Sequence, residues 1–172
     1  MRSGQRPVPL TMADDSLNAL VAGHYERLIR LAGLICRDRA DTQDVVQIAL
    51  ARAWRHLGAL RDVERVRPWI DRIVVREAIR MEHSRTARLS WIVRPQATEI
   101  ALGHPTNDRD LVLRDAYRNL PTHQRAAIAL HYFAGYSVAE VASLTDVPIE
   151  TARSRLRLGR ARLHAALGDE TS

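Results

Sequence analysis

Apolar residues recur at spacings of three and four along almost the whole chain, whereas alternation with a period of two is scarce. This pattern is typical of amphipathic helices and predicts an all-α fold. In the first half of the chain it predicts three helices, at residues 16–35, 41–57 and 68–84. Asp41 is a favoured N-cap residue, Gly58 a favoured residue after a helix, and Pro68 a favoured first-turn residue. Trp54 and Trp69 each lie on an apolar stripe, so we expect both in the core.

The helical pattern breaks between residues 86 and 107, where the chain contains Pro95, Gly103 and Pro105. Such a long segment without periodicity is unusual inside a compact domain and indicates a domain boundary. Beyond it the pattern predicts four shorter helices, at residues 108–119, 122–134, 137–144 and 148–167. We therefore expect two small helical domains joined by a flexible linker. The predicted limits are a loose N-terminal tail at 1–15, a first domain at 16–88, the linker at 89–107 and a second domain at 108–168.

Residues 136–163 have the pattern of a helix-turn-helix, a motif whose second helix enters the DNA major groove. Ser137 and Glu140 have the spacing of a capping box, and Pro148 opens the second helix. Asp146 occupies the turn position at which glycine is common, and Asp tolerates the left-handed backbone conformation better than most residues. We therefore expect the second domain to read DNA. The alternative is an ordinary helical hairpin with a solvated basic face.

Positive charge is concentrated in two parts of the chain. The 26 basic residues are all arginine, and the formal net charge is +6. Nine arginines and five acidic residues fall in 61–94, and five arginines and one acidic residue fall in 149–163, so the remainder is slightly acidic. Two separate basic clusters are expected of a protein that binds a polyanion at two places. The absence of lysine fits either phosphate recognition by guanidinium groups or codon bias in a GC-rich genome, and we favour codon bias.

The sequence offers little for other classes of function. Its one cysteine, Cys36, excludes a disulfide framework and a cysteine-rich zinc site within the chain, and we expect it in the core. The histidines lack metal-ligand spacing, and there is no nucleophile elbow, phosphate loop or pair of catalytic carboxylates. We therefore predict no catalytic residue, metal, cofactor or small-molecule substrate. We also expect a cytoplasmic protein without membrane insertion, because no segment reads as a membrane span or a secretory signal.

Five motifs, in order, resemble those of the extracytoplasmic-function (ECF) subfamily of bacterial sigma factors. The segments that carry the resemblance are 41–47 (DTQDVVQ) with 52–55 (RAWR), 67–73 (RPWIDRI), 119–125 (NLPTHQR), 136–142 (YSVAEVA) and 147–156 (VPIETARSRL). In the same order they are similar to DAEDVVQ with RAWR, RAWLYRIA, LPERQR, YSYAEIA and VPEGTVKSRL. The resemblance covers about residues 17–90 and 108–167, which is most of the chain.

The resemblance implies a sigma factor, not an enzyme, that binds core RNA polymerase and directs promoter-specific transcription initiation. The first domain (region 2) would bind polymerase and recognise and melt the minus-ten element. The second (region 4) would bind the minus-thirty-five element, and an anti-sigma factor would be a further partner. The candidates are Asp44, Gln47 and Arg52 for polymerase; Arg67, Arg72, Arg76, Arg80 and His83 for minus-ten DNA; and Thr151, Arg153, Ser154, Arg155 and Arg157 for minus-thirty-five DNA.

Two alternatives stay open from the residues. Asp44 also suits an acid placed near a helix N-terminus, with no polymerase contact. A self-sufficient DNA-binding regulator would need only the helix-turn-helix, with the first domain as a sensor or dimerisation module; nothing in the residues supports a helical enzyme.

The linker length also predicts how the free domains are arranged. The two promoter elements in this family lie about 50 Å apart along the DNA. A flexible coil of about 22 residues averages only about 25 Å from end to end. We therefore expect the two domains to sit closer together in the free protein than on a promoter.

Overall fold

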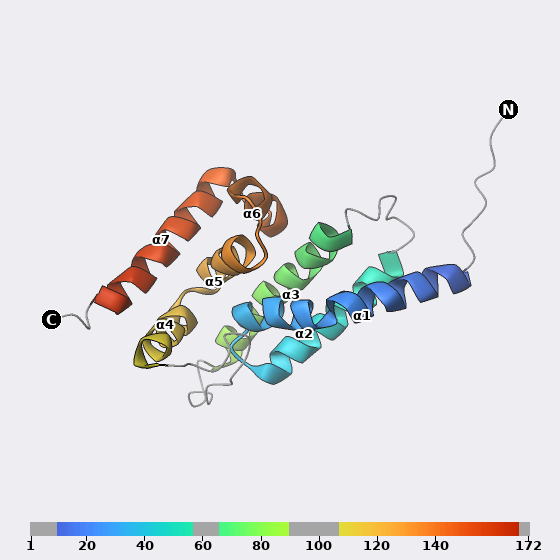
Figure 1. Ribbon diagram of the computed structural model, residues 1–172, viewed down its shortest axis with the longest axis horizontal. Helices are drawn as coiled ribbons and strands as arrows, with labels where there is room; N and C mark the ends of the chain where they lie inside the picture. Colours follow the sequence, from blue (N-terminus) through green and yellow to red (C-terminus); the bar gives the residue numbers. More distant parts are fainter. Residues whose placement is uncertain (1–9, 57–65, 90–106, 169–172) are drawn as a thin grey trace.

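The computed structural model is all-helical, as predicted (Figure 1). It describes residues 10–56, 66–89 and 107–168, and no strand occurs in these three ranges. The elements in chain order are α1 (Leu10–Ile35), α2 (Arg39–His56), α3 (Val66–Leu89), α4 (Asp108–Asn119), α5 (Thr122–Ile128), the π-helical turn η3 (Ala129–Phe133), α6 (Val138–Thr145) and α7 (Ile149–Gly168). Nearly all of the predicted linker at 89–107 lies outside the described residues.

Helices α1, α2 and α3 form an N-terminal bundle in which each helix packs against the other two. Each contributes a stripe of fully buried apolar side chains at the three- and four-residue spacing that the sequence predicts. The stripes are Leu28, Leu31 and Ile35 on α1, Val45, Val46, Ala49 and Ala53 on α2, and Ile70, Val74 and Ala78 on α3. The buried Cys36 follows directly after α1, as expected of a core cysteine.

Three helices begin earlier than the sequence pattern predicts, and α3 does so by two residues, at Val66. The Asp38 carboxylate accepts hydrogen bonds from the backbone N–H groups of Ala40 (2.7 Å) and Asp41 (3.4 Å), so Asp38 rather than Asp41 is the N-cap of α2. Helix α1 begins at Leu10, so residues 10–15, predicted as part of a loose tail, are helical. Neither proline nor glycine occurs between residues 10 and 16 to stop the helix there.

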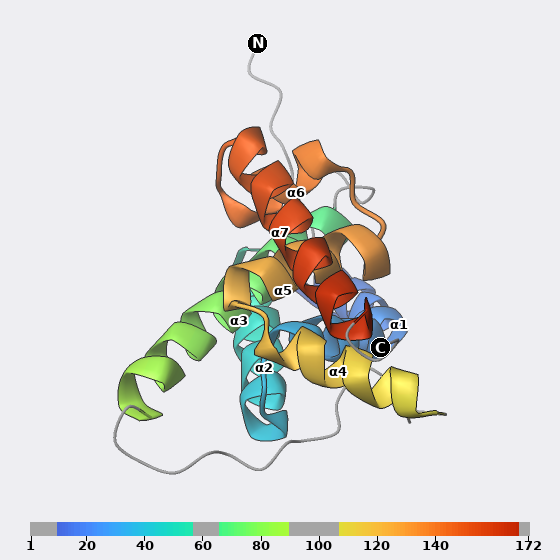
Figure 2. The same ribbon diagram turned by 90° about the vertical axis from the view of Figure 1, so that its left-hand side faces the viewer.

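The C-terminal domain consists of α4, α5, η3, α6 and α7, with α7 packed along α4, α5 and α6 (Figure 2). Helix α7 approaches α5 closely at Gly159, where an added Cβ would lie 3.2 Å from the Ile128 Cγ1 atom and the Ile128 side chain would have to shift. A single helix was predicted at 122–134, but after Ile128 the backbone widens into the π-helical turn η3, which Gly135 follows with a φ of 79°. One wide turn does not change the apolar spacing enough to be read from the sequence.

The helix-turn-helix has the local structure that its residues predict. The Ser137 hydroxyl accepts a hydrogen bond from the Glu140 backbone N–H, and the Glu140 carboxylate accepts one from the Ser137 backbone N–H, which completes the capping box. Asp146 ends α6 in the left-handed conformation, with φ 58° and ψ 51°. The two signals therefore fix the start of α6 and the turn that directs α7.

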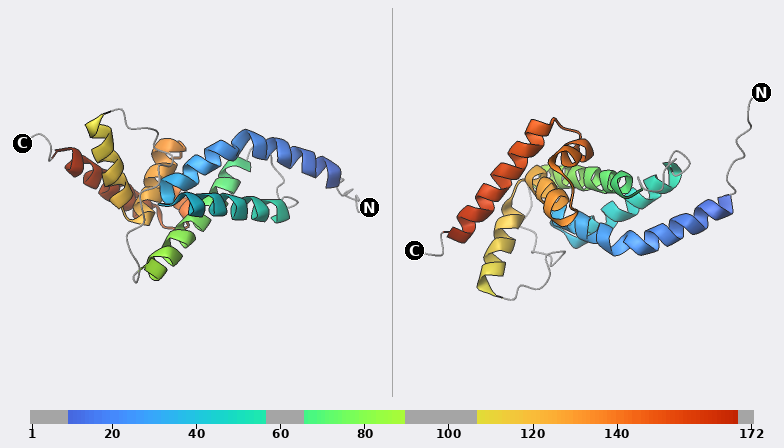
Figure 3. Two further views of the ribbon diagram at one scale, coloured as in Figure 1. Left: turned by 90° about the horizontal axis from the view of Figure 1, so that it is seen from below. Right: turned by 45° about the horizontal axis from the view of Figure 1, so that its top comes forward.

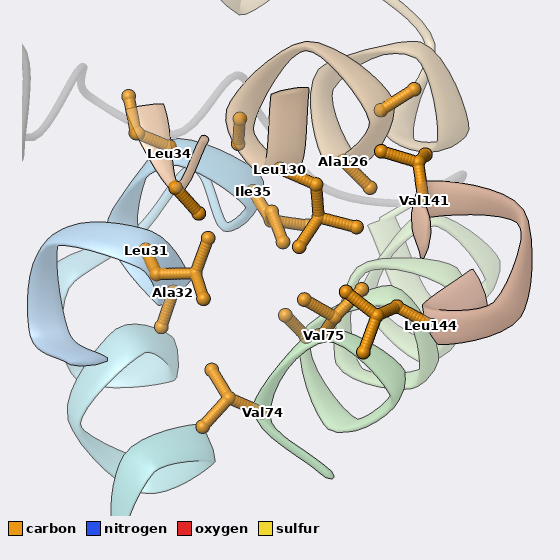
Figure 4. Packing of buried hydrophobic residues seen from close by; sticks show 14 of the residues in the cluster. Leu31, Ala32, Leu34, Ile35, Val74, Val75, Ala126, Leu130, Val141 and Leu144 are labelled. Carbon is orange, nitrogen blue, oxygen red and sulfur yellow. The ribbon is translucent and has the colours of Figure 1, made fainter. Parts of the chain in front are cut away.

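One continuous core joins the N-terminal bundle to the C-terminal domain (Figure 4). Ile35 of α1, Val75 of α3, Leu130 of η3 and Leu144 of α6 are all buried in it. Helix α3 packs against α5 and α6, and α1 packs against α5 and η3. The two halves are thus in direct contact. The free ends of α1 and α2 extend away from this contact (Figure 3).

Candidate nucleic-acid and polymerase interfaces

The outer face of α2 presents two of the three polymerase candidates. Asp44 and Gln47 are exposed about one turn apart, on the side of the helix opposite its buried stripe. Arg52 lies on the flank of α2 that faces α3, where its guanidinium pairs with the buried Glu77 carboxylate. Glu77 also accepts hydrogen bonds from Arg80, at 3.0 and 2.6 Å. The structure therefore brings Asp44 and Gln47 together and turns Arg52 toward α3.

The placement of Trp54 in the core was wrong. The side chain of Trp54 is 47 % exposed, and it follows Gln47 by seven residues, which puts the two on the same helix face. The core beneath this part of α2 is filled by Ala49 and Ala53. Trp69, in contrast, is partly buried and packs against the core as expected. The outer face of α2 therefore carries a large apolar side chain beside its two polar candidates.

The structure places Asp44 outside the first turn of α2. The N-cap is Asp38, and the first-turn acid is Asp41. Asp44 lies beyond the first turn, where the favourable interaction of a carboxylate with the helix dipole has largely faded.

Two minus-ten candidates near the start of α3 bind the C-terminal domain. Arg67 donates a hydrogen bond to the Ala134 carbonyl at 2.6 Å, and its guanidinium carbon lies 5.7 Å from the centre of the Tyr136 ring. Arg72 donates to both the carbonyl oxygen (3.1 Å) and the hydroxyl (2.8 Å) of Ser143 in α6. Both guanidinium groups therefore have neutral oxygen acceptors in the other domain.

Two further minus-ten candidates also contact the C-terminal domain. Arg76 pairs with Asp146, the residue in the helix-turn-helix turn, at 3.3 Å. The His83 ring lies edge-on to the ring of His123 in α5, with centroids 4.9 Å apart. Of the five minus-ten candidates, four thus contact the C-terminal domain, and the fifth, Arg80, pairs with Glu77 in its own helix.

A buried carboxylate anchors one end of this contact. Asp71 is fully buried and accepts two hydrogen bonds from Arg27 of α1, at 2.9 and 2.6 Å. Its Oδ2 atom also accepts a hydrogen bond from the Tyr136 hydroxyl at 2.8 Å. Burial, together with this bond to a carboxylate, raises the pKa of Tyr136 well above its usual value. The Tyr136 hydroxyl of the C-terminal domain therefore keeps its proton and donates a hydrogen bond to Asp71 of the N-terminal bundle.

A buried arginine anchors the other end. Arg125 of α5 is 1 % exposed and donates at 2.7 Å to the Glu82 carboxylate of α3. It also donates to the Ile35 carbonyl at the end of α1, at 3.0 and 2.7 Å, and to the Leu120 carbonyl at 2.7 Å. Carbonyls at a helix C-terminus lack intrahelical partners and favour a nearby cation. Sequence reasoning gave Arg125 no role, although its apolar neighbours at 126–128 indicate a buried position.

The minus-thirty-five candidates divide between two sides of α7. Arg153 and Arg157 are exposed, one turn apart, with the half-buried Ser154 between them. Thr151 and Arg155 are half-buried on the opposite flank. The side chain of Arg153 is 59 % exposed and pairs with Glu150 in its own helix. The structure therefore presents Arg153, Ser154 and Arg157 together near the N-terminal end of the recognition helix.

Comparison with known proteins identifies the two halves. The sigma-70 region 2 family matches residues 20–88, and the sigma-70, region 4 family matches residues 110–163. The ECF RNA polymerase sigma factor SigM of Mycobacterium tuberculosis is 33% identical over 163 residues, which cover 89% of this chain and 78% of SigM. SigL of the same organism is 30% identical over 148 residues, which cover 81% and 82% of the two chains.

The chain belongs to the ECF sigma factor family. It therefore binds core RNA polymerase and promoter DNA and directs promoter-specific transcription initiation. The alternative of a self-sufficient DNA-binding regulator is not favoured. The N-terminal bundle corresponds to region 2, and the C-terminal domain corresponds to region 4.

Two solved structures share this fold. The sigma factor RpoE from Bartonella quintana, solved in complex with the anti-sigma factor NepR, has a TM-score of 0.71 and 21% identity over 89% of this chain and 97% of RpoE. CnrH, solved in complex with the cytosolic domain of CnrY, has a TM-score of 0.63 and 25% identity over 92% and 91%. Within the described ranges, no helix could span a membrane, and no group of His, Cys, Asp and Glu side chains could hold a metal ion.

Region 4 also contains a basic groove that sequence reasoning missed. A cavity of about 440 Å³ lies between η3 and α7, and its lining includes Arg153, Arg157 and Arg160. His131 and His164 add two further donors. A row of guanidinium and imidazole groups on one flank of a recognition helix suits contact with DNA phosphates.

The interface histidine predicts a pH dependence of stability. The His123 Nδ1 atom is buried without a hydrogen-bond partner among the described residues. Burial, followed by the charges of Arg155 and His83, lowers the pKa of His123. A group with a lowered pKa in the folded state stabilises the fold above its unfolded pKa, about 6.5 for histidine, and this stability is lost as the pH falls through the folded pKa.

We therefore expect acidification to destabilise the protein partly through His123. In urea unfolding at about pH 7.5 and about pH 5.5, the His123→Gln variant should lose less free energy of unfolding than the unchanged protein, because glutamine has no proton to gain. Equal losses in the two proteins would show that His123 protonates as easily in the folded state as in the unfolded chain.

Proposed function

We propose that three helices divide the work of this sigma factor. The outer face of α2, with Asp44 and Gln47, binds core polymerase; α3 binds the minus-ten element; and the recognition helix α7 binds the minus-thirty-five element. The observation that carries this proposal is the separation of three exposed faces on three different helices, of which one is mixed in chemistry and two are rich in arginine. The face of α2 mixes a carboxylate, an amide and an indole, whereas α3 and α7 present arginines.

The exposed Trp54 extends the proposed polymerase face. An indole beside polar groups is typical of the anchors that dominate protein interfaces. The face carries the carboxylate of Asp44 and is unsuited to a DNA backbone, so a protein partner fits it better. Arg52 supports this face indirectly, because its pairing with Glu77 joins α2 to α3.

Replacing both Asp44 and Gln47 with alanine should weaken binding to core polymerase about tenfold to a hundredfold, the sum expected for two interfacial hydrogen-bonding groups. The helical content should not change, because both side chains are exposed and neither caps α2. Binding can be measured by titrating labelled protein with purified core polymerase, with circular dichroism as the check on folding.

A matched control is His56→Ala. His56 is exposed on the same helix, and its nine-residue separation from Gln47 points it to the opposite side of α2. This variant should bind polymerase as the unchanged protein does. If Asp44→Ala/Gln47→Ala retains full affinity, or loses helical content instead, the proposed polymerase face is wrong.

In this proposal the exposed faces of α3 and α7 bind different parts of the promoter. On α3, the arginines and His83 hold the backbone of the separated minus-ten strand. On α7, Arg153, Ser154 and Arg157 read base edges, and the basic groove with Arg160 holds an adjacent phosphate. Thr151 and Arg155, on the other flank, contact the opposite wall of the major groove. The linker at 89–107 connects the two domains near the polymerase active site.

We further propose that an anti-sigma factor regulates this protein. We also propose that this sigma factor acts in the cytoplasm and has no catalytic activity of its own. The two solved structures that share its fold were both determined with a bound partner: RpoE with the anti-sigma factor NepR, and CnrH with the cytosolic domain of CnrY. Co-purification of the tagged chain from its native host tests this partner. Recovery of polymerase subunits alone would count against an anti-sigma factor.

A further inference from the structure

The basic groove between η3 and α7 contains a histidine whose protonation pattern is set by its surroundings. His131 lines the groove from η3, and Arg157 and Arg160 line it from α7. The His131 Nδ1 atom lies 2.7 Å from the Tyr136 carbonyl oxygen. Because a carbonyl oxygen can only accept a hydrogen bond, Nδ1 carries the proton of the neutral ring. The other ring nitrogen, Nε2, is therefore unprotonated whenever His131 is neutral.

The turn after η3 holds the imidazole in a fixed orientation. The Tyr136 backbone N–H donates to the Leu130 carbonyl at 3.0 Å, which fixes the peptide whose carbonyl accepts from His131. The Tyr132 ring lies edge-on to the imidazole, with centroids 4.8 Å apart. A side chain held in this way loses little further conformational entropy when its remaining nitrogen binds a ligand.

The charged groups that face His131 across the groove are all cationic, and α6 contributes only the uncharged Val138. No carboxylate belongs to the lining within the described part of the chain. The lining residues that carry a charge or can titrate, besides His131, are Tyr132 from η3 and Arg153, Arg157, Arg160 and His164 from α7. A groove of this composition attracts an anion and contains no internal group that would neutralise a protonated imidazole.

The two forms of the ring interact differently with a DNA phosphate. Neutral Nε2 presents a lone pair, which repels a phosphate oxygen. Protonated Nε2 is an N–H donor on a cation, and it can form the stronger, charge-assisted class of hydrogen bond to that oxygen. A phosphate therefore binds the protonated ring in preference, and by linkage the binding of a proton and the binding of DNA strengthen each other.

We propose that His131 is a proton-dependent DNA contact, in which the protonated imidazole and Arg160 hold one backbone phosphate, so that the affinity of region 4 for duplex DNA rises as the pH falls. The proposal rests on the assignment of α7 to the minus-thirty-five element, and it adds η3 to the DNA-binding surface. Helix α7 lies on the outer side of the molecule, where a duplex can reach this groove (Figures 1 and 2). Histidine is the side chain that normally changes charge between pH 5 and pH 8, so promoter binding would follow the pH around the protein.

The test measures affinity for a labelled duplex pool of randomised sequence by fluorescence anisotropy, because a phosphate contact does not depend on sequence. Between about pH 7.5 and about pH 6.0 the charged fraction of an ordinary histidine rises about eightfold, so we expect the unchanged protein to bind about fivefold more tightly at the lower pH. The slope of log affinity against log salt should also steepen by about 0.6, since each neutralised phosphate contributes about 0.9. Circular dichroism at both pH values checks that the protein stays folded.

Two substitutions separate the charge of His131 from its shape. The amide of His131→Gln can still donate to the Tyr136 carbonyl but gains no proton, so its affinity should change less than about twofold between the two pH values. His131→Arg carries a permanent charge and should bind at about pH 7.5 as tightly as the unchanged protein binds at about pH 6.0.

Two other histidines serve as controls. His164 also lines the groove, but it is exposed and no hydrogen bond within the described residues fixes its ring. His164→Gln should therefore keep most of the pH response. His56→Gln changes an exposed histidine of α2, far from α7 in the chain, and should keep all of it.

The outcomes distinguish this inference from the function on which it rests. A pH response that persists in His131→Gln, or that disappears in His164→Gln instead, would overturn the role of His131. Duplex affinity that is independent of pH in the unchanged protein would overturn the proton dependence and leave the minus-thirty-five assignment intact. Absence of duplex binding in every protein at both pH values would contradict that assignment and this inference with it.

Discussion

Arg125→Ala is expected to lower the free energy of unfolding by about 3 to 5 kcal/mol, the cost typical of removing one partner of a buried ion pair. The substitution leaves the Glu82 carboxylate buried with its charge less compensated and leaves the Ile35 and Leu120 carbonyls without these donors. Burial lowers the pKa of Arg125, while the neighbouring Glu82 carboxylate opposes this shift, which is the balance expected of a guanidinium held in a protein interior. Urea denaturation followed by circular dichroism measures the loss.

Two comparisons sharpen this expectation. Arg109→Ala removes an exposed arginine of α4 and should change the free energy of unfolding by less than about 0.5 kcal/mol. Arg125→Met combined with Glu82→Leu removes both charges and should recover part of the loss, because the single variant is penalised mainly for an unpaired charge. A single variant that loses less than about 1 kcal/mol would contradict the buried position of Arg125.

Arg153→Ala and Arg157→Ala should each weaken binding to the correct minus-thirty-five element by about 1 to 3 kcal/mol, the discrimination that one bidentate contact to guanine provides. Both side chains are exposed on the leading part of α7, so folding should not change. The measurement compares duplexes that carry the best selected sequence with duplexes altered at single base pairs. A variant that has lost its base contact should bind with equal affinity to duplexes that differ at the one base pair which the arginine contacts.

The pattern of affinity loss across DNA sequences distinguishes a residue that contacts base edges from one that contacts phosphates. A residue that contacts phosphate weakens binding equally on all sequences and reduces the salt dependence of affinity. Arg160→Ala in the basic groove should behave in this way, since Arg160 lies further along α7 beside His164. A sequence-independent loss for both Arg153 and Arg157 would show that other residues of α7 read the bases.

Short-range signals predicted much of the fold. The capping box of Ser137 and Glu140 and the left-handed Asp146 were readable because each depends on a few neighbouring residues. The N-cap of α2 was misplaced because Asp38 and Asp41 are equally good capping residues, and the choice depends on where the chain leaves α1. Trp54 was misplaced because an indole on the edge of a stripe gives the same spacing whether it points inward or outward.

The candidate site was predictable in its helix faces but not in its partners. The family resemblance placed Asp44 and Gln47 on one helix, helical spacing placed Arg153 with Arg157, and the structure keeps each pair together. Periodicity gave no sign that Arg72 binds Ser143, 71 residues away along the chain, because no local pattern encodes such a distance. Closure of the two domains therefore had to be inferred from linker length alone, and its contacts came from the structure.

The most direct test of the account is promoter-dependent transcription by purified core RNA polymerase supplemented with this protein and a promoter library. The account predicts transcripts that start at a defined set of promoters only when the protein is present. It also predicts loss of these transcripts with Asp44→Ala/Gln47→Ala, through polymerase binding, and with Arg153→Ala/Arg157→Ala, through promoter choice. Unchanged transcription in both double variants, or no protein-dependent transcript and no binding to core polymerase, would contradict it.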